Sequence, residues 1–120
     1  MLKVVVGIDI VNRIVETING EDISPEINLE NILSAVSHVL NIPVLDIRSK
    51  SRKREFTDAR KYYCILAKTY TGMTLNNIGR LVNYKHDVVI YSNNLSEHLL
   101  SYDLRFRHEY NLIKERLNLK

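Results

Sequence analysis

The chain has 120 residues, of which 45% are hydrophobic and 26% charged, a balance typical of one globular domain and not of a disordered segment. No apolar run approaches the roughly 20 residues that span a bilayer, and the start of the chain lacks the features of a signal peptide. The single cysteine, Cys64, excludes an internal disulfide and fits a reducing cytoplasm.

The net charge of +3 is unevenly distributed. Residues 1–47 carry two basic and seven acidic side chains, whereas residues 48–120 carry fifteen basic and seven acidic ones. The basic part is therefore expected to meet a polyanion, with the acidic N-terminal third facing away from it.

The first 27 residues are predicted to form an N-terminal extension made of a helix and a loop. Apolar residues at helical spacing predict the helix over about 8–18, and the pair Asn19-Gly20 ends it. The preceding Val4-Val5-Val6 is β-branched and is also compatible with a short strand. Residues 21–26 are polar and contain a proline, which predicts a loop.

Residues 28–120 are predicted to form one domain, a compact helical bundle of about six helices. Asn28 is a suitable N-cap for an amphipathic helix that stops at Asn41-Ile42-Pro43. Residues 44–47 are then expected to form one short helical turn.

A basic, polar loop over 48–54 leads into a longer helix over 54–70, where apolar residues recur at spacings of three and four. Gly72 follows this helix and is expected to adopt the left-handed conformation that helix C-termini often need. Thr74 is predicted to cap a short helix over 75–82.

Two further helices complete the domain, one over 86–100 and one capped by Asp103. Nothing after residue 27 has the pattern of a strand, so the predicted class is all-α. The inward stripes expected on the two helices are Val88, Ser92, Leu95 and Leu99, and then Leu104, Arg107, Tyr110, Ile113 and Leu117.

Residues 74–100 have the pattern of a helix-turn-helix: a short helix, a tight turn at Asn83 and a longer helix. Gly79 permits close approach of the two helices, and the second helix of such a unit enters the major groove by its N-terminal residues. Helix pairs of this kind also occur in proteins that never touch DNA. The candidate groove residues are Lys85, His86, Asp87 and Tyr91.

The loop over 48–54 concentrates positive charge, and its cations repel one another unless an anion arrives. Phosphates are the expected anions, because each neutralised phosphate releases a counterion. A loop also lets an arginine enter a narrow minor groove. The alternative is a solvated surface loop. The cations are Arg48, Lys50, Arg52, Lys53 and Arg54, followed by Arg60 and Lys61.

The basic loop and the helix-turn-helix pattern occur here together, at the spacing that is typical of a known family. The matching residues are Asp46-Ile47-Arg48-Ser49-Lys50-Ser51-Arg52-Lys53-Arg54-Glu55, Ala59-Arg60, Leu66-Ala67, Thr71-Gly72-Met73-Thr74-Leu75 and Ile78-Gly79-Arg80. On these residues, the stretch over 28–100 resembles the C-terminal, DNA-binding domain of the bacterial replication initiator DnaA. Residues 1–27 show no resemblance.

The resemblance implies double-stranded DNA as the partner and a role in replication or a related regulation. It implies that Arg52 enters the minor groove, that Arg60, Lys61 and Lys68 contact phosphates, and that the opening residues of the recognition helix read bases. The DNA-binding residues expected on all these grounds are Lys50, Arg52, Lys53, Arg54, Arg60, Lys61, Lys68, Thr74, Lys85, His86, Asp87 and Val88.

The recognition helix departs from the family pattern, which opens with Asp-His-Thr-Thr-Val or Asp-His-Ser-Thr-Val. One alignment places Lys85-His86-Asp87-Val88-Val89 there after a turn one residue shorter, and another sets His86-Asp87 against Asp-His. Val88 lacks a hydroxyl, and phosphates repel Asp87, although its carboxylate can accept from cytosine. A good bidentate base contact supplies roughly 1–3 kcal/mol of discrimination, so weak, salt-sensitive or differently specific binding is expected.

The sequence has no residue pattern that predicts an active site or a metal site. The chain has four glycines and no Gly-x-x-x-x-Gly-Lys-Ser/Thr motif, so it is not expected to bind nucleotide or to be an ATP-driven initiator; a small regulator, or a phage or mobile-element protein, fits better. The four histidines are scattered, so no metal or other cofactor is expected. Cys64 and most tyrosines are expected in the core instead of catalysing or stacking on bases.

Two hypotheses of different class remain. The first is a cytoplasmic double-stranded DNA-binding protein that is not an enzyme. The second is an interaction module that kept the fold and lost base reading, with a homodimer interface extended through Ile8, Val11 and Val15 of the N-terminal segment.

Overall fold

The computed structural model describes residues 27–119, and these form six helices without a strand. This confirms the all-α class and the expected number of helices. The helix predicted over 8–18 lies outside the described residues. The helices are α1 (Leu29–Leu40), α2 (Val44–Ile47), α3 (Arg54–Tyr70), α4 (Leu75–Arg80), α5 (His86–Tyr102) and α6 (Leu104–Arg116).

Polar side chains begin three of the helices as predicted, because each accepts a hydrogen bond from a backbone N–H in the first turn. Gly72 behaves differently from the prediction: no glycine among the described residues has positive φ, and α3 ends at Thr71 in extended backbone instead. The hydroxyl of Thr71 donates to a carbonyl of the last turn, which satisfies that end without a left-handed residue. The three capping residues are Asn28 (2.8 Å), Thr74 (3.2 Å) and Asp103 (3.0 Å).

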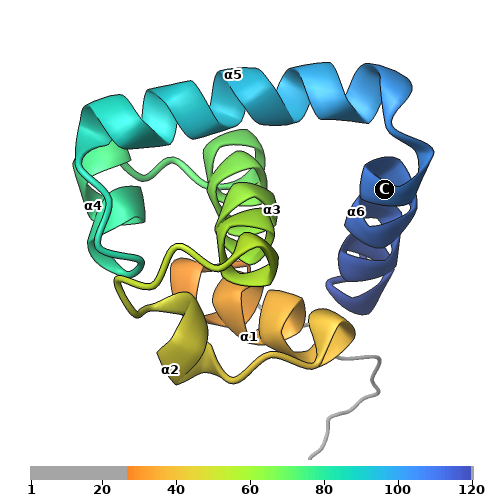
Figure 1. Ribbon diagram of the computed structural model, residues 1–120, viewed down its shortest axis with the longest axis horizontal. Coiled ribbons are helices and arrows are strands. Elements are labelled where there is room, and N and C mark those ends of the chain that lie inside the picture. The colour runs from red at the N-terminus through yellow and green to blue at the C-terminus, as the bar shows by residue number, and fades with distance from the viewer. Residues whose placement is uncertain (1–26, 120) are drawn as a thin grey trace, which may run out of the picture.

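Helix α3 is the centre of the fold, with α1 crossing below it, α5 lying across its upper end and α6 at its side (Figure 1). The Tyr62 ring stacks on Phe106 of α6 with centroids 4.3 Å apart, and its hydroxyl donates to Glu109. Burial raises the pKa of the Cys64 thiol to about 12, so at neutral pH this group is an uncharged core side chain. The expected core position of Cys64 and Tyr62 is confirmed.

The predicted inward stripe of α5 is wrong at its first position, Val88, whereas Ser92 is buried as expected and Leu95 and Leu99 are half-buried. Val88 is 39% exposed, whereas Val89 is fully buried. The reason is that α5 packs by small side chains, Ser92, Asn93 and Ser96, so its buried face is narrow and partly polar. A hydrophobic pattern cannot detect such a face.

The stripe predicted for α6 needs a similar correction. Leu104 is 74% exposed because it directly follows the Asp103 cap at the corner between α5 and α6. Arg107 is also exposed, and its guanidinium donates to the carbonyls of Leu100 and Ser101 at the end of α5. The α6 residues that enter the core are Phe106, Tyr110 and Ile113, with Leu117 just beyond the helix.

Candidate nucleic-acid interface

Helices α4 and α5 form the helix-turn-helix, and Gly79 sets how closely they approach. A Cβ atom at Gly79 would lie 2.2 Å from the carbonyl oxygen of Tyr84 and 3.0 Å from the Cγ2 atom of Val89. The backbone N–H of Tyr84 donates to the Gly79 carbonyl at 2.9 Å. Asn83 occupies the left-handed region with φ of 62°, a conformation that asparagine tolerates better than most residues. The expectations for Gly79 and Asn83 are confirmed.

The basic loop, residues 48–53, connects α2 to α3 and is built around a buried arginine. Arg60 of α3 is 2% exposed. Its Nε donates to the carbonyl of Ile47 at 2.6 Å, and its Nη1 donates to that of Ser51 at 2.7 Å. Its Nη2 donates to the carbonyls of Ser49 at 2.7 Å and Asp46 at 3.3 Å. The loop therefore has a defined shape rather than that of a freely moving segment.

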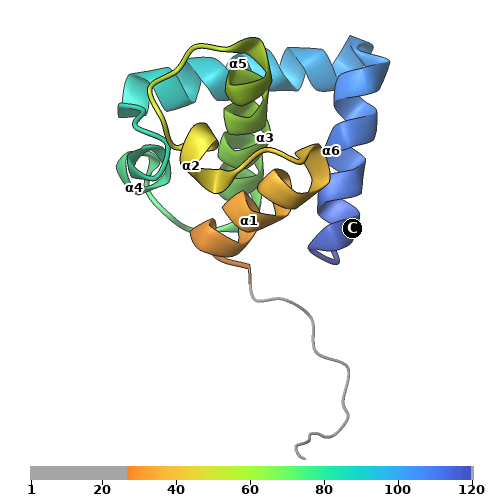
Figure 2. The same cartoon turned by 60° about the horizontal axis from the view of Figure 1, so that its bottom comes forward.

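Two further hydrogen bonds attach the basic loop to the turn of the helix-turn-helix. The Nε of Arg48 donates to the carbonyl of Leu81 at 2.9 Å. In the reverse direction, the side-chain amide of Asn83 donates to the carbonyl of Arg48. Both ribbon views agree that the loop passes the α4–α5 connection before it enters α3 (Figures 1 and 2). Two segments more than thirty residues apart thus form one surface.

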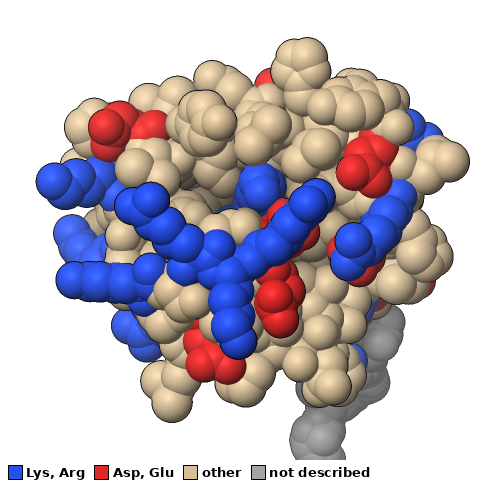
Figure 3. Space-filling model, in the orientation of Figure 1, with Lys and Arg blue, Asp and Glu red and all other residues tan. Residues whose placement is uncertain are grey.

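A hollow of about 440 Å³ lies between the basic loop and the start of α5. Figure 3 shows lysines and arginines gathered over this side of the molecule, with acidic side chains beside and below them. Because phosphates are attracted to such a cationic concavity, the geometry suits an anionic ligand. The lining residues are Ser49, Lys50, Arg52, Thr57, Arg60, Val82, Asn83, Tyr84 and Val88.

A second hollow, of about 610 Å³, lies on the other side of the amino end of α5, against α4. Arg80 lines it and was not among the predicted site residues, although it belongs to the recognised string Ile78-Gly79-Arg80. The signal was a cation on the exposed face of the first helix of the motif, where α4 meets α5. The other residues that line this hollow are Asn76, Tyr84, Lys85, His86 and Asp87.

The predicted site residues fall into three groups in the structure. Arg60 is buried, and Lys61 is half-buried and paired with Asp58 at 3.0 Å, so neither presents the exposed cation that was expected. Lys68 is exposed but lies near the far end of α3, about 20 Å from its first turn at 1.5 Å per residue, and the exposed Thr74 caps α4. The exposed residues of the basic loop and the two helix starts are Lys50, Arg52, Lys53, Arg54, Lys85, His86, Asp87 and Val88.

Comparison with known proteins identifies the family. A family model described as the bacterial DnaA protein helix-turn-helix matches residues 29–94, which is more than half of the chain and includes the basic loop and the start of α5. The chain belongs to this family.

Three chromosomal replication initiator proteins DnaA illustrate the relationship. The one from Borrelia garinii subsp. bavariensis is 32% identical over 120 residues, covering 94% of this chain and 24% of the relative. The one from Campylobacter fetus subsp. fetus is 33% identical over 95 residues (78% and 22%), and DnaA 2 from Chlamydia pneumoniae is 30% identical over 92 residues (77% and 20%). The chain spans about a quarter of the length of these relatives.

The first of these alignments also bears on the N-terminal residues. An alignment that covers 94% of 120 residues must extend into residues 1–27, where sequence inspection found no resemblance. The DnaA family likeness is therefore longer than the helix-turn-helix region. Within residues 27–119, no helix is long and apolar enough to cross a membrane, and no group of three or more His, Cys, Asp or Glu side chains is arranged to hold a metal ion.

Proposed function

We propose that this protein binds double-stranded DNA, with Arg52 in the minor groove and the amino end of α5 in the adjacent major groove. The observation that carries the proposal is the pair of hydrogen bonds between Arg48 and the α4–α5 turn, at Leu81 and Asn83. They hold the cationic loop and the recognition helix on one surface, as simultaneous contact with two grooves requires. Family membership supports the same function.

The surface meets the physical requirements of a duplex. An α-helix about 10–12 Å in diameter fits the major groove, which is about 12 Å wide. Arg52 and Lys53 are exposed on the basic loop, so phosphates or the negative minor groove can neutralise them without a change of fold. Lys85 precedes α5 and its side chain takes no part in capping that helix, which leaves it able to reach a phosphate or a guanine.

Base reading by α5 is expected to differ from that of the full-length relatives. His86, Asp87 and Val88 are exposed on the first turn of α5. Val88 offers a thymine methyl group an apolar contact, and the Asp87 carboxylate can accept a hydrogen bond from cytosine N4. We propose a different or weaker sequence preference together with backbone binding that depends strongly on salt.

We further propose that the protein acts in bacterial DNA replication or its regulation, in the cytoplasm, as a binding protein and not as an enzyme. Its relatives are initiators of which it spans only about a quarter, so its role in the process is part of the proposal. Phosphate contacts by Lys61, Lys68 and Thr74 also remain proposals.

Fluorescence anisotropy with a labelled duplex at low salt tests DNA binding. The double variant Arg52→Ala, Lys53→Ala is expected to bind at least about 10-fold more weakly and to show a salt slope smaller by about 1–2, because two cationic contacts are lost. The matched control is Lys114→Ala, Arg116→Ala, which removes the same charge from the end of α6, across α3 from the basic loop. Equal affinities for wild type and both variants would overturn the assignment.

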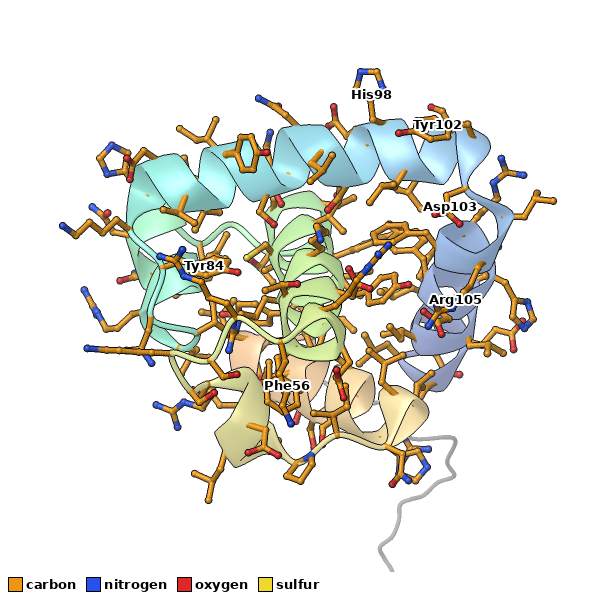
Figure 4. All side chains as sticks on the ribbon, viewed as in Figure 1. Phe56, Tyr84, His98, Tyr102, Asp103 and Arg105 are labelled. Carbon is orange, nitrogen blue, oxygen red and sulfur yellow. The ribbon has the colours of Figure 1, made fainter. Side chains whose placement is uncertain are left out.

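A second candidate function is a protein-interaction module. The observation that favours it is the exposed apolar and aromatic surface of α5, where Ile90 is 43%, Tyr91 69% and Tyr102 65% exposed. Figure 4 shows His98 and Tyr102 projecting from α5 away from the body of the domain. Light scattering discriminates: a stable dimer without salt-dependent DNA binding favours this candidate. The dimer contacts expected through Ile8, Val11 and Val15 fall outside the described residues.

A further inference from the structure

Arg60 is an unusual cation because it is buried against neutral oxygen atoms. Only 2% of it is exposed, and its hydrogen bonds go to backbone carbonyls and, more weakly, to the Ser49 hydroxyl. A buried charge is costly unless hydrogen bonds replace its lost hydration. The carbonyls of the basic loop fulfil that need, so the loop is held against Arg60 by strong, charge-assisted bonds.

The pattern of acceptors explains the shape of the loop. Three of the carbonyls that accept from Arg60 belong to residues 47, 49 and 51, which alternate along the chain. Ile47 ends α2 and Arg48 still has helical dihedral angles, so the backbone turns around the Arg60 guanidinium as it leaves the helix. The intervening Arg48 and Lys50 are exposed, as is Arg52, which follows Ser51. One buried cation thus organises a backbone whose exposed cations would otherwise drive it to spread.

Arg60 also contacts the helix-turn-helix. Its guanidinium carbon lies 5.9 Å from the ring centre of Tyr84, within the range of a cation–π interaction. Tyr84 belongs to the α4–α5 turn and lies between this turn and α3 (Figure 4). Arg60 therefore contacts both parts of the surface: the basic loop through hydrogen bonds and the turn through the Tyr84 ring.

We propose that Arg60 is a positioning residue of the DNA interface, which preorganises the basic loop so that Arg52 and α5 engage the duplex together. This inference rests on the proposed DNA-binding function and assigns Arg60 a role other than a phosphate contact. Preorganisation raises affinity because the entropy cost of ordering the loop is met in folding and not in binding.

The first experiment measures the loop without DNA. Arg60→Lys keeps the charge but lacks the planar fork that reaches several carbonyls at once. We expect trypsin to cleave after Lys50, Arg52 and Lys53 at least about 10-fold faster in this variant, because local opening exposes the loop. Circular dichroism and thermal unfolding establish that the rest of the domain is folded. Unchanged cleavage in a folded variant overturns the proposal, whatever the DNA affinity.

The second experiment is a double-mutant cycle by anisotropy. We expect Arg60→Lys to weaken binding by about 10-fold, although the charge is retained. In that background, Arg52→Ala should have less than a threefold effect, whereas in wild type it should cost about 10-fold. Lys85→Ala on the recognition helix should cost the same in both backgrounds. Full retention of affinity in Arg60→Lys, or independent effects of Arg60→Lys and Arg52→Ala, contradicts positioning and indicates a direct phosphate contact.

A second variant covers the case in which Arg60→Lys does not fold. Asn83→Gly removes the amide that donates to the Arg48 carbonyl, while glycine accepts the positive φ at this position. It should release the loop from the turn only partly, because Arg60 still holds the carbonyls. We expect faster tryptic cleavage than in wild type and a smaller effect of Arg52→Ala. Cleavage as fast as in the urea-unfolded protein contradicts the proposal, because it would mean that the Asn83 hydrogen bond, and not Arg60, holds the loop. Failure of wild-type protein to bind any duplex removes the proposed function but leaves the proteolysis result interpretable.

Discussion

Helices α3 and α5 both have 17 residues, but α3 lies in the centre of the domain and α5 lies across its surface. Helix α3 buries eight residues, all but one of them part of the hydrophobic core, and is surrounded on several sides. Helix α5 buries four, and three of these, Ser92, Asn93 and Ser96, are polar. Both side-chain amide atoms of Asn93 are buried without a hydrogen-bond partner in the part of the chain that the structure describes. Packing thus stabilises α3 much more than α5.

This difference in burial assigns the two helices different roles: α3 mainly stabilises the fold, and α5 presents residues to a ligand. A helix that lies across the surface on a narrow face leaves its other residues free to vary with the ligand, as in Val88 and Tyr91 of α5. The residues of a central helix have no such freedom. The one buried charged residue of α3, Arg60, donates its hydrogen bonds to the basic loop. Substitutions in α3 should therefore change the free energy of unfolding, and those on the outer face of α5 should change DNA binding.

The largest expected effect is that of shortening a core side chain of α3. Leu66 has no exposed surface, so Leu66→Ala should lower the free energy of unfolding by about 2–5 kcal/mol through lost burial and a residual cavity. Urea denaturation measures the change. The contrasting variant on α5, Tyr91→Ala, removes a larger but 69% exposed side chain and should change stability by less than about 0.5 kcal/mol. Similar losses for the two would break the comparison.

Next in size is a substitution at the contact between α4 and α5. Gly79→Ala places a Cβ against the backbone carbonyl of Tyr84, which cannot rotate away, and should cost about 1–3 kcal/mol. Gly72→Ala is the matched control, because nothing lies within 4 Å of its Cβ position and its φ is not positive. Thermal unfolding should show a lower Tm for the first variant only. A neutral Gly79→Ala would mean that the two helices separate without penalty.

A smaller effect is expected where α5 gives way to α6. Asp103→Ala removes the acceptor for the first turn of α6 and should cost about 1 kcal/mol. Asp103→Asn retains an oxygen at the same place and should restore most of the stability. Chemical denaturation of the three proteins provides the test, and equal stability of the alanine and asparagine variants would show that the cap contributes little.

The smallest expected effect concerns base reading by α5. Replacing single thymines by uracil in a bound duplex should weaken wild-type binding by about 0.8 kcal/mol where Val88 meets the methyl group, and should not affect Val88→Ala. The stability of Val88→Ala should stay within about 0.5 kcal/mol of wild type, since the side chain is 39% exposed. A scan of uracil positions that affects both proteins alike would exclude Val88 from the groove contact.

Local chemistry explains which features could be predicted. The bounds of α3, the short turn of α2, and the caps Asn28, Thr74 and Asp103 follow from neighbouring residues, because caps and turns act over three or four positions. The conformation that follows α3 was not predicted, because the Thr71 hydroxyl satisfies the helix end in place of the expected left-handed glycine. The position of Val89 inside and Val88 outside was missed because α5 packs by serine and asparagine.

The amino-acid sequence by itself determined the helices, their caps, the concentration of cations after residue 47 and the likeness to the DnaA helix-turn-helix. Only the tertiary structure decided that Arg60 is a buried cation among exposed ones, and that the basic loop is attached to the α4–α5 turn through Arg48 and Asn83. The physical reason is that helix formation depends on near neighbours, whereas the burial of a charge depends on which distant carbonyls the fold brings around it.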